Sequence, residues 1–223
     1  MLDGLEDVPW ASVRHAFGSA SDVPSLLRSL VSSDAQVRDS ALTELCNNIW
    51  HQGTVYEATP HALPFLIRLL HREDYPERGS IACLVASIIA GRGYYEVHSG
   101  SFELLVGTQP DEFADEIEKE QAIVAEIRRI GASALATLLP FLADPERWIR
   151  GTVAEALACY PSRASDFVPV LERACPSRKT RRPVSESKRA WTTFGIPPNQ
   201  PLQPTSGGRA RGGCGSMGCA ARG

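Results

Sequence analysis

The sequence predicts an all-α protein made of three to four helical hairpins, and two observations lead to this fold class. The segment VPSLLRSL, residues 23 to 30, returns as LPFLIRLL at residues 63 to 70, forty positions later. Within each copy the apolar residues recur at steps of three and four, as they do on one face of an α-helix. A single hairpin cannot bury such a face, so neighbouring copies must stack into an α-solenoid.

Each copy divides into two helices joined by a short polar link, which reads SSD, REDYP or ADP. Ser21 and Asp22 precede Pro24 and mark a helix start, because proline is tolerated in a first helical turn. A third copy reads LATLLPFLADPERWIRGTVAEAL, and a fourth begins at Asp166 without completing its second helix. The hairpins are therefore expected to be antiparallel helices with tight connections.

A proline in the first helix, an aspartate before the second and the VR or IR pair that opens it resemble HEAT repeats, over about residues 20 to 175. The resemblance implies that the first helices line a convex side and the second helices a concave side. It also implies a ladder of Asp and Arg side chains that bond across the turns, from repeat to repeat. The ladder positions are Asp34, Arg38, Asp74, Arg78, Asp144 and Arg150. Glu77 stands where the other copies have Val37 and Ile149, so the second copy matches less closely.

The chain is expected to divide into a repeat domain, residues 1 to 175, and a tail, residues 176 to 223. The domain carries an insertion at about residues 92 to 112, because the third copy follows the second after 72 residues instead of forty. The insertion is expected to be a loop with two short strands around Ser99 and Gly100, followed by a helix. The tail is rich in Pro, Gly, Ser and Arg, which predicts disorder.

Charge differs sharply between these two parts. The domain holds 14 Lys or Arg against 25 Asp or Glu, whereas the tail holds 9 against 1. An acidic domain is a poor match for a phosphate backbone, so nucleic-acid binding by it is not expected. Within the tail, the run NQPLQPTSGG, residues 199 to 208, resembles the tails of reading frames carried in mobile gene cassettes.

The sequence contains neither a membrane-spanning segment nor a common catalytic or metal-binding motif. No apolar run approaches the ~18 residues of a membrane span, and the acidic N-terminus lacks a secretory pattern, so the cytoplasm is the expected location. The six cysteines form no C-x-x-C pair, and no His-Glu dipeptide, phosphate loop or G-x-S-x-G motif occurs. No cofactor and no metal are therefore expected.

The best candidate binding site begins in NNIWHQGTVYEAT, residues 47 to 59. Its candidate residues are Thr43, Asn47, His51, Gln52 and Tyr56. If the second helix of the first copy continues through this stretch, the first three lie at i, i+4 and i+8 and form a polar stripe on the concave side. They are then placed to contact a ligand or a partner. The alternative is that Gly53 ends the helix and the neighbouring polar side chains bond nearby carbonyl groups.

The matching helix of the second copy, SIACLVASIIAG, has hardly a polar face and must be covered. Either the insertion directly after it or a partner protein is expected to provide this cover. In both cases Tyr94, Tyr95 and His98 are expected around the same groove as His51 and Tyr56. A metal site from His51 and His98 lacks a third ligand.

An acidic run, PDEFADEIEKE, follows the insertion. Asp111, Glu112, Asp115 and Glu116 are candidates for docking a basic partner, and the basic tail of the same chain would compete for them. The alternative is a solvated helix face beside a thin apolar seam of Phe113 and Ile117.

Taken together, these features predict a non-catalytic protein-interaction module that binds another protein through the concave groove and the insertion. The alternative is an enzyme or small-molecule binder that uses the groove near His51 and Tyr56. A third possibility is an immunity-type protein that neutralises a toxin, which an acidic surface would suit.

Overall fold

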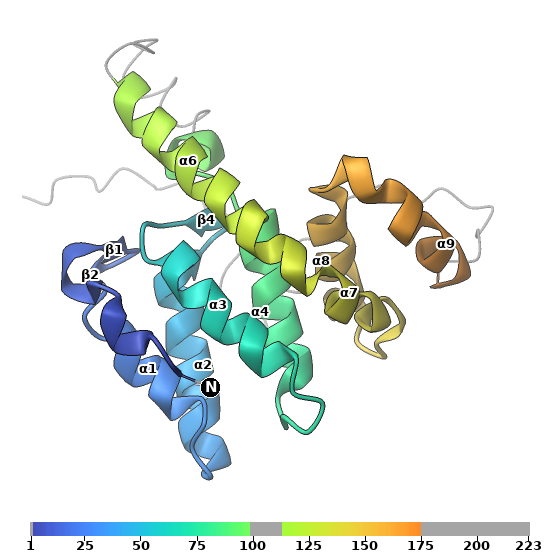
Figure 1. The fold of residues 1–223 in the computed structure, drawn as a ribbon, viewed down its shortest axis with the longest axis horizontal. Helices are drawn as coiled ribbons and strands as arrows, with labels where there is room; N and C mark the ends of the chain where they lie inside the picture. The colour runs from blue at the N-terminus through green and yellow to red at the C-terminus, as the bar shows by residue number, and fades with distance from the viewer. Residues whose placement is uncertain (1, 99–112, 175–223) are drawn as a thin grey trace, which may run out of the picture.

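The computed structural model describes residues 2 to 98 and 113 to 174 (Figure 1). Most of these residues are helical, and the strands among them form two short antiparallel pairs, in agreement with the predicted all-α class. Among them, no helix is both long enough and apolar enough to cross a membrane. The strands predicted around Ser99 and Gly100, the docking candidates Asp111 and Glu112, and the tail from residue 175 lie outside the described residues.

The first hairpin consists of α1, Val23–Ser29, and α2, Ala35–Ile49. Pro24 lies in the first turn of α1, where its missing N–H group would have had no helical partner. Asp34 caps α2, because its carboxylate accepts a hydrogen bond from the Gln36 N–H at 2.8 Å. The two helices pack through fully buried leucines, including Leu27 and Leu45.

The second hairpin consists of α3, Thr59–Leu70, and α4, Arg78–Ala90. Every residue from Ile81 to Ile89 is buried, so α4 is the apolar centre of the protein. The helices that pack against α4 are α3, α6 and α8. Within the described residues, cover for this apolar helix comes largely from other helices of the chain. The sequence predicts cover by the insertion or by a partner protein.

The third hairpin follows the long helix α6, Ala114–Gly131, and a 3-10 turn, η4, Ala132–Ala134. Its first helix is broken at Pro140, which lacks an N–H donor, into α7, Leu135–Leu138, and the 3-10 segment η5, Leu139–Ala143. Its second helix is α8, Arg147–Ala158. The described chain then continues through η6, Pro161–Arg163, into α9, Ala164–Ala174.

Several short elements were not predicted from the sequence. Two 3-10 turns, η1, Leu5–Asp7, and η2, Trp10–Ser12, precede the strand pair of β1, Arg14–His15, and β2, Gly18–Ser19. A second strand pair, β3, Trp50–His51, and β4, Thr54–Val55, connects the first two hairpins.

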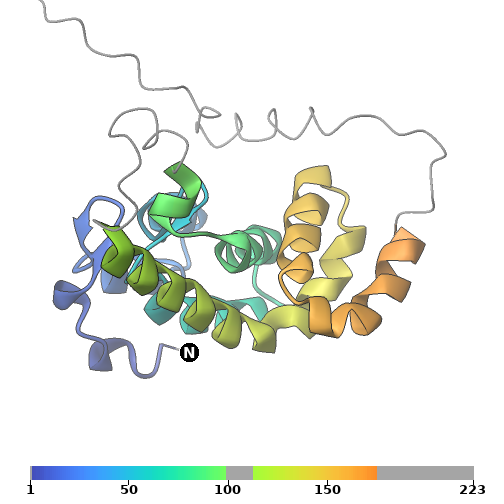
Figure 2. The same ribbon diagram turned by 90° about the horizontal axis from the view of Figure 1, so that it is seen from above.

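The hairpins follow one another along the long axis of the molecule, from the N-terminal turns at one end to α9 at the other (Figure 2). Helix α6 runs across this row and packs on α3 and α4 (Figure 1). Helix α6 therefore packs against both helices of the second hairpin and also links this hairpin to the third.

Charged hydrogen bonds join the first hairpin to the second, at what we call the first junction. Arg38 donates through Nε and Nη2 to the Glu77 carboxylate at 2.7 to 3.0 Å, and through Nη1 to carbonyl oxygens of the turn between α1 and α2. The Tyr75 hydroxyl donates to the Leu30 carbonyl at 2.9 Å. Hydrogen bonding from Arg38 lowers the pKa of Glu77, because it stabilises the carboxylate.

Apolar packing joins the second hairpin to the third, at what we call the second junction. Here α4 lies along α8 in the most extensive helix contact of the described chain. Gly131 at the end of α6 approaches Ile89 so closely that an added Cβ would lie 2.6 Å from the Ile89 Cγ1 atom. The Arg78 guanidinium lies over the Phe141 ring, 5.3 Å from its centroid, and its Nε donates to the Leu70 carbonyl.

The ladder residues implied by the HEAT resemblance therefore behave differently from one another. Arg38 and Arg78 reach the next hairpin. The other four residues bond to partners within their own hairpins: Asp34, Asp74, Asp144 and Arg150. The expectation of a ladder from repeat to repeat fails at these four positions for local reasons. The aspartates at 34 and 144 accept from backbone N–H groups at helix starts, and the one at 74 pairs with Arg72. Arg150 bonds carbonyl oxygens of the turn before α8.

Candidate functional site

His51 lies in a strand and not on a helix, which corrects the predicted polar stripe. Helix α2 ends at Ile49, and β3 pairs with β4 in an antiparallel hairpin that sets His51 opposite Thr54. The two loop residues, Gln52 and Gly53, have φ angles of 52° and 92°, as a two-residue type I′ turn requires. Aromatic and β-branched residues on both sides favour strands over continuation of the helix.

The other stripe residues stay on α2 and are separated from His51 by this turn of the chain. Thr43 is exposed and Asn47 is half-buried. Gln52 is exposed at the hairpin tip. The stripe of three polar residues on one helix face is therefore absent, and His51 belongs to a different surface from Thr43.

The chain after α4 joins the β3–β4 hairpin as a third extended segment. The Val55 N–H donates to the Arg92 carbonyl at 3.0 Å, and the Arg92 N–H donates to the Gly53 carbonyl at 3.0 Å. Gly91 permits this approach, because a Cβ atom there would lie 2.5 Å from the Val55 Cγ1 atom. The start of the insertion is thus tied to the end of the first hairpin.

The insertion then begins with a helix over residues 94 to 98, where the sequence predicted a loop. Glu120 of α6 accepts a hydrogen bond from the Tyr95 N–H at 3.0 Å and so caps this helix from another element. Gly93 leaves room for the carboxylate, because a Cβ atom there would lie 2.4 Å from the Glu120 Oε2 atom. Burial raises the pKa of Glu120, and the backbone N–H groups oppose that rise.

These connections gather rings from three separate parts of the chain into what we call the aromatic cluster. Its members are Phe17, His51, Tyr56, Tyr94, Tyr95 and His98. Phe17 and His51 meet edge to face with centroids 5.4 Å apart, and Tyr94 stacks on His98 at 4.2 Å. The neighbouring His98 contributes to the lowered pKa of His51, and Tyr94 contributes to the raised pKa of Tyr56, so the two pairs of rings lie in one neighbourhood. The structure therefore brings together five of the residues selected from the sequence.

Phe17 was missed by the sequence reasoning, although its side chain is 67 % exposed. It lies in the loop between β1 and β2, where its N–H donates to His15 Nδ1 at 3.0 Å. That bond leaves the proton of the neutral ring on Nε2, which lies 3.0 Å from an Asp22 carboxylate oxygen. Asn48 donates to the other oxygen at 2.7 Å. A partly buried polar network thus holds the backbone at Phe17, whose ring is exposed.

One polar atom of the aromatic cluster, His51 Nδ1, is buried without a hydrogen-bond partner in the described part of the chain. Thr54 Oγ1 is also buried, and the Tyr56 phenol lies within its hydrogen-bonding range. Because His51 and Thr54 face each other across the β3–β4 ladder, their side chains lie on the same face of the hairpin. Burial, and then the neighbouring His98, lowers the pKa of His51, so its ring is neutral near pH 7. Burial raises the pKa of Tyr56 to about 12, so its phenol keeps its proton.

The aromatic cluster offers ring faces and hydrogen-bonding groups, including the neutral His51 imidazole and the protonated Tyr56 phenol. The Glu120 carboxylate beside it is engaged by the Tyr95 N–H. The thiols of Cys46 and Cys83 are poor nucleophiles, because burial raises the pKa of Cys46 to about 12 and that of Cys83 to about 11. In the segments that the structure describes, no group of three or more His, Cys, Asp or Glu side chains could hold a metal ion.

The acidic candidates Asp115 and Glu116 are exposed in the first turn of α6. There they favour the helix, because carboxylates stabilise the positive end of its dipole. The apolar seam predicted beside them is present, since Phe113 packs on Tyr95 with centroids 5.1 Å apart and Ile117 is half-buried.

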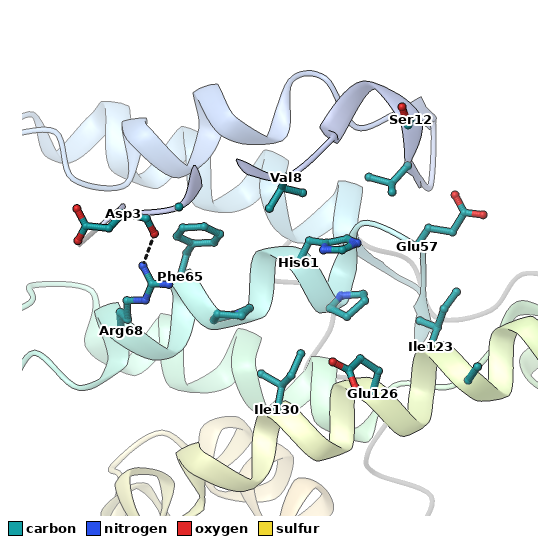
Figure 3. Close-up of a pocket in the computed structure, with 15 residues that line it drawn as sticks. Asp3, Val8, Ser12, Glu57, His61, Phe65, Arg68, Ile123, Glu126 and Ile130 are labelled. Carbon is teal, nitrogen blue, oxygen red and sulfur yellow. Dashed lines mark hydrogen bonds between the residues drawn. The ribbon is translucent and has the colours of Figure 1, made fainter. Parts of the chain in front are cut away.

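A second surface, which the sequence reasoning missed, is a groove of about 770 Å³ between the N-terminal turns, α3 and α6 (Figure 3). Its apolar lining residues are Val8, Val13, Pro60, Pro64, Phe65, Ala122, Ile123 and Ile130. Its ionisable lining residues are Asp3, Glu57, His61, Arg68 and Glu126. The turns η1 and η2 form one side of this groove, which we call its N-terminal wall. Because these turns show no periodic pattern in the sequence, the groove could not be predicted. We call this surface the N-terminal groove.

The position of the N-terminal wall is set by contacts with α3. Trp10 donates through its indole N–H to the Leu5 carbonyl at 2.8 Å and packs near His61 and Phe65. Arg68 donates to the Asp3 carbonyl at 2.9 Å, as the dashed line in Figure 3 marks.

Comparison with known proteins finds no significant match of the chain to a family model, to a curated protein or to a solved structure.

Proposed function

We propose that the protein is a non-catalytic interaction module, a scaffold or adaptor, that binds another protein through the aromatic cluster. The observation that carries the proposal is the exposure of rings that converge from distant segments: Phe17 is 67 % exposed and Tyr94 is 41 % exposed. Aromatic residues are enriched at the centres of protein interfaces, where they supply much of the binding free energy. Large exposed aromatic rings held in one place are suited to that use.

The rigidity of the cluster supports the same function. Phe17 is held through His15 and Asp22, the β3–β4 hairpin is held by Arg92, and the helix over residues 94 to 98 is capped by Glu120. A surface that is ordered before binding loses less conformational entropy when a partner docks. The acidic charge of the domain favours a protein partner over a nucleic acid.

The scaffold in this proposal is a HEAT-like solenoid, with the first helices of the hairpins on the convex side and the second helices on the concave side. Support comes from the succession of hairpins along one axis and from the packing of α4 on α8, both second helices. The insertion at the aromatic cluster interrupts that succession between the second and third hairpins.

A small-molecule binder or enzyme that uses His51 and Tyr56 is a second candidate, and one observation favours it. The unpartnered His51 Nδ1 atom is buried, and such an atom commonly binds a water or a polar ligand. A ligand that donates to His51 would satisfy it, and the nearby Thr54 hydroxyl and Tyr56 phenol could bind other groups of the same ligand.

The deciding experiment is affinity capture with the full chain and a Phe17→Ala/Tyr94→Ala variant. Because neither side chain is buried, we expect a folded variant and a loss of about tenfold or more in retention of one specific protein. Val31→Ala/Val168→Ala is the matched control, since it removes two other exposed apolar side chains, and it should retain that protein.

Equal retention by both double variants would contradict the proposal. The two candidate functions are separated by His51→Ala and Thr54→Val in a thermal-shift screen of metabolites. A stabilising metabolite whose effect is lost in these variants, with no protein captured, would favour the small-molecule function.

A further inference from the structure

We propose that the N-terminal groove binds a segment of this same chain, residues 178 to 196. The inference concerns a different surface from the aromatic cluster and does not depend on the proposed function. It rests on the lining of the groove, on the composition of the segment and on the length of the chain that connects them.

The groove is lined by apolar side chains, which we call its floor, and by carboxylates, which we call its rim. Phe65 of α3 and Ile123 and Ile130 of α6 belong to the floor, and Glu57 and Glu126 belong to the rim (Figure 3). Glu57 accepts one hydrogen bond from the Arg14 N–H at 3.0 Å, and Glu126 pairs with Arg129 at 2.7 Å. Each carboxylate has further lone pairs, so both can accept from an additional cation.

The positive charge in the groove is already engaged. Arg68 donates to the Asp3 carbonyl, and its guanidinium lies over the Phe65 ring, 4.7 Å from the centroid. Its stem and charged head therefore belong to the wall of the groove. A segment that enters should be apolar where it meets the floor and basic where it meets the rim.

Residues 178 to 196 read RKTRRPVSESKRAWTTFGI and have this composition. Six Lys or Arg and one Glu lie between residues 178 and 189, and three large apolar residues follow: Trp191, Phe194 and Ile196. The domain itself is strongly acidic, with 25 Asp or Glu against 14 Lys or Arg over residues 1 to 175, so its field attracts this segment. Trp191 and Phe194 supply rings of the kind that fill apolar grooves.

The connection is long enough. A compact domain of this size has a radius of gyration of about 16 Å, so it is roughly 40 Å across. The chain between Ala174 and Trp191 can extend to about 56 Å at about 3.3 Å per residue. A tethered segment also has an effective concentration on the order of 1 mM, so weak contacts are enough to fill the groove.

The chain contains three lysines, which makes the test specific: Lys119, Lys179 and Lys188. The full chain is treated at low concentration with a carbodiimide, which joins lysines directly to carboxylates in contact, and the products are mapped by mass spectrometry. We expect links from Lys188 to Glu57 or Glu126, because Lys188 lies three residues before Trp191. Lys119 on α6 reports the general reactivity of the sample, because it lies among carboxylates of its own helix.

Two variants in the full chain identify the contacts without removing a reactive group. Trp191→Ala/Phe194→Ala and Ile123→Arg should each lower the yield of the groove links at least fivefold while the Lys119 links persist. A chain that ends at residue 197 should keep the links, because the run from 199 to 208 has no part in the contact. Circular dichroism checks that each variant is folded.

Three results would overturn the proposal. One is that Lys119 reacts while the tail lysines form no link to the groove. Another is that the tail lysines link to carboxylates all over the domain with yields that neither variant changes. The third is that a mixture of isotopically light and heavy chains gives mostly mixed links, because the occupant would then be a second copy of the chain.

Discussion

At the first junction Arg38 binds Glu77 through charged hydrogen bonds, whereas at the second junction α4 lies against α8 through aliphatic side chains. The two junctions join successive hairpins, but different chemistry holds each of them. Charged hydrogen bonds fix an orientation but contribute modest net free energy, because both groups give up water. Apolar packing contributes more free energy and tolerates less change in volume. The second junction should therefore contribute more to the free energy of unfolding. The contribution of the first junction should depend on pH.

The largest effect should come from Ile89→Ala, which removes a fully buried side chain from the second junction. We expect the free energy of unfolding to fall by about 3 kcal/mol, within the 2 to 5 kcal/mol typical of a buried Ile→Ala change. Urea denaturation followed by circular dichroism measures it. Val31→Ala, at a 42 % exposed position, is the control and should change it little. A loss no greater than in the control would mean that the apolar junction is not the stronger one.

A smaller effect should follow from Glu77→Gln at the first junction. At pH 7 we expect this change to lower the free energy of unfolding by less than about half of the loss expected for Ile89→Ala. The folded protein lowers the pKa of Glu77 below its usual 4.5, through hydrogen bonds from Arg38. The stabilisation is therefore complete above about pH 4.5 and is lost as the pH falls through the lowered pKa.

The measurement for this variant is the free energy of unfolding at several pH values between 7 and 3. The native protein should lose more stability over this range than Glu77→Gln, so the two curves should approach each other in acid. Parallel curves would show that the junction does not depend on the ionised carboxylate.

The smallest effect is expected for Asp74→Ala, although the HEAT resemblance places Asp74 in the structural ladder. Its carboxylate pairs with Arg72, and both side chains are exposed. Exposed pairs of this kind contribute little to stability. The urea midpoint should therefore stay within error of the native value. A loss comparable to that of Glu77→Gln would restore Asp74 to the ladder and weaken the contrast between the two junctions.

The helical hairpins could be predicted because their signals are local: helical spacing of leucines, prolines in first turns and short polar links. The role of Glu77 could not, because its partner is 39 residues away and the position is apolar in the other copies. The sequence predicts His51 near Tyr56, Tyr94 and His98, but it predicts His51 on a helix. In the structure Gln52 and Gly53 adopt positive φ angles and turn the chain into a strand pair that contains His51.

Other parts of the candidate surfaces depend on contacts that no single segment reveals. Phe17 lies in a short loop whose position depends on Asp22 and Asn48. The helix over residues 94 to 98 is capped by Glu120, which lies beyond the insertion. The N-terminal groove requires turns without periodicity to fold onto α3. Each of these features is set by tertiary structure, which overrides local preference.

The uniformly apolar α4 also constrains how the chain can be made. During synthesis α4 emerges well before α8, its main packing partner, which ends at Ala158. At about 5 to 20 residues per second, the delay is on the order of several seconds. Throughout that time an aliphatic helix without its neighbour is prone to aggregate. The nascent chain is therefore expected to need a chaperone, or slow folding of the second hairpin, until the third is complete.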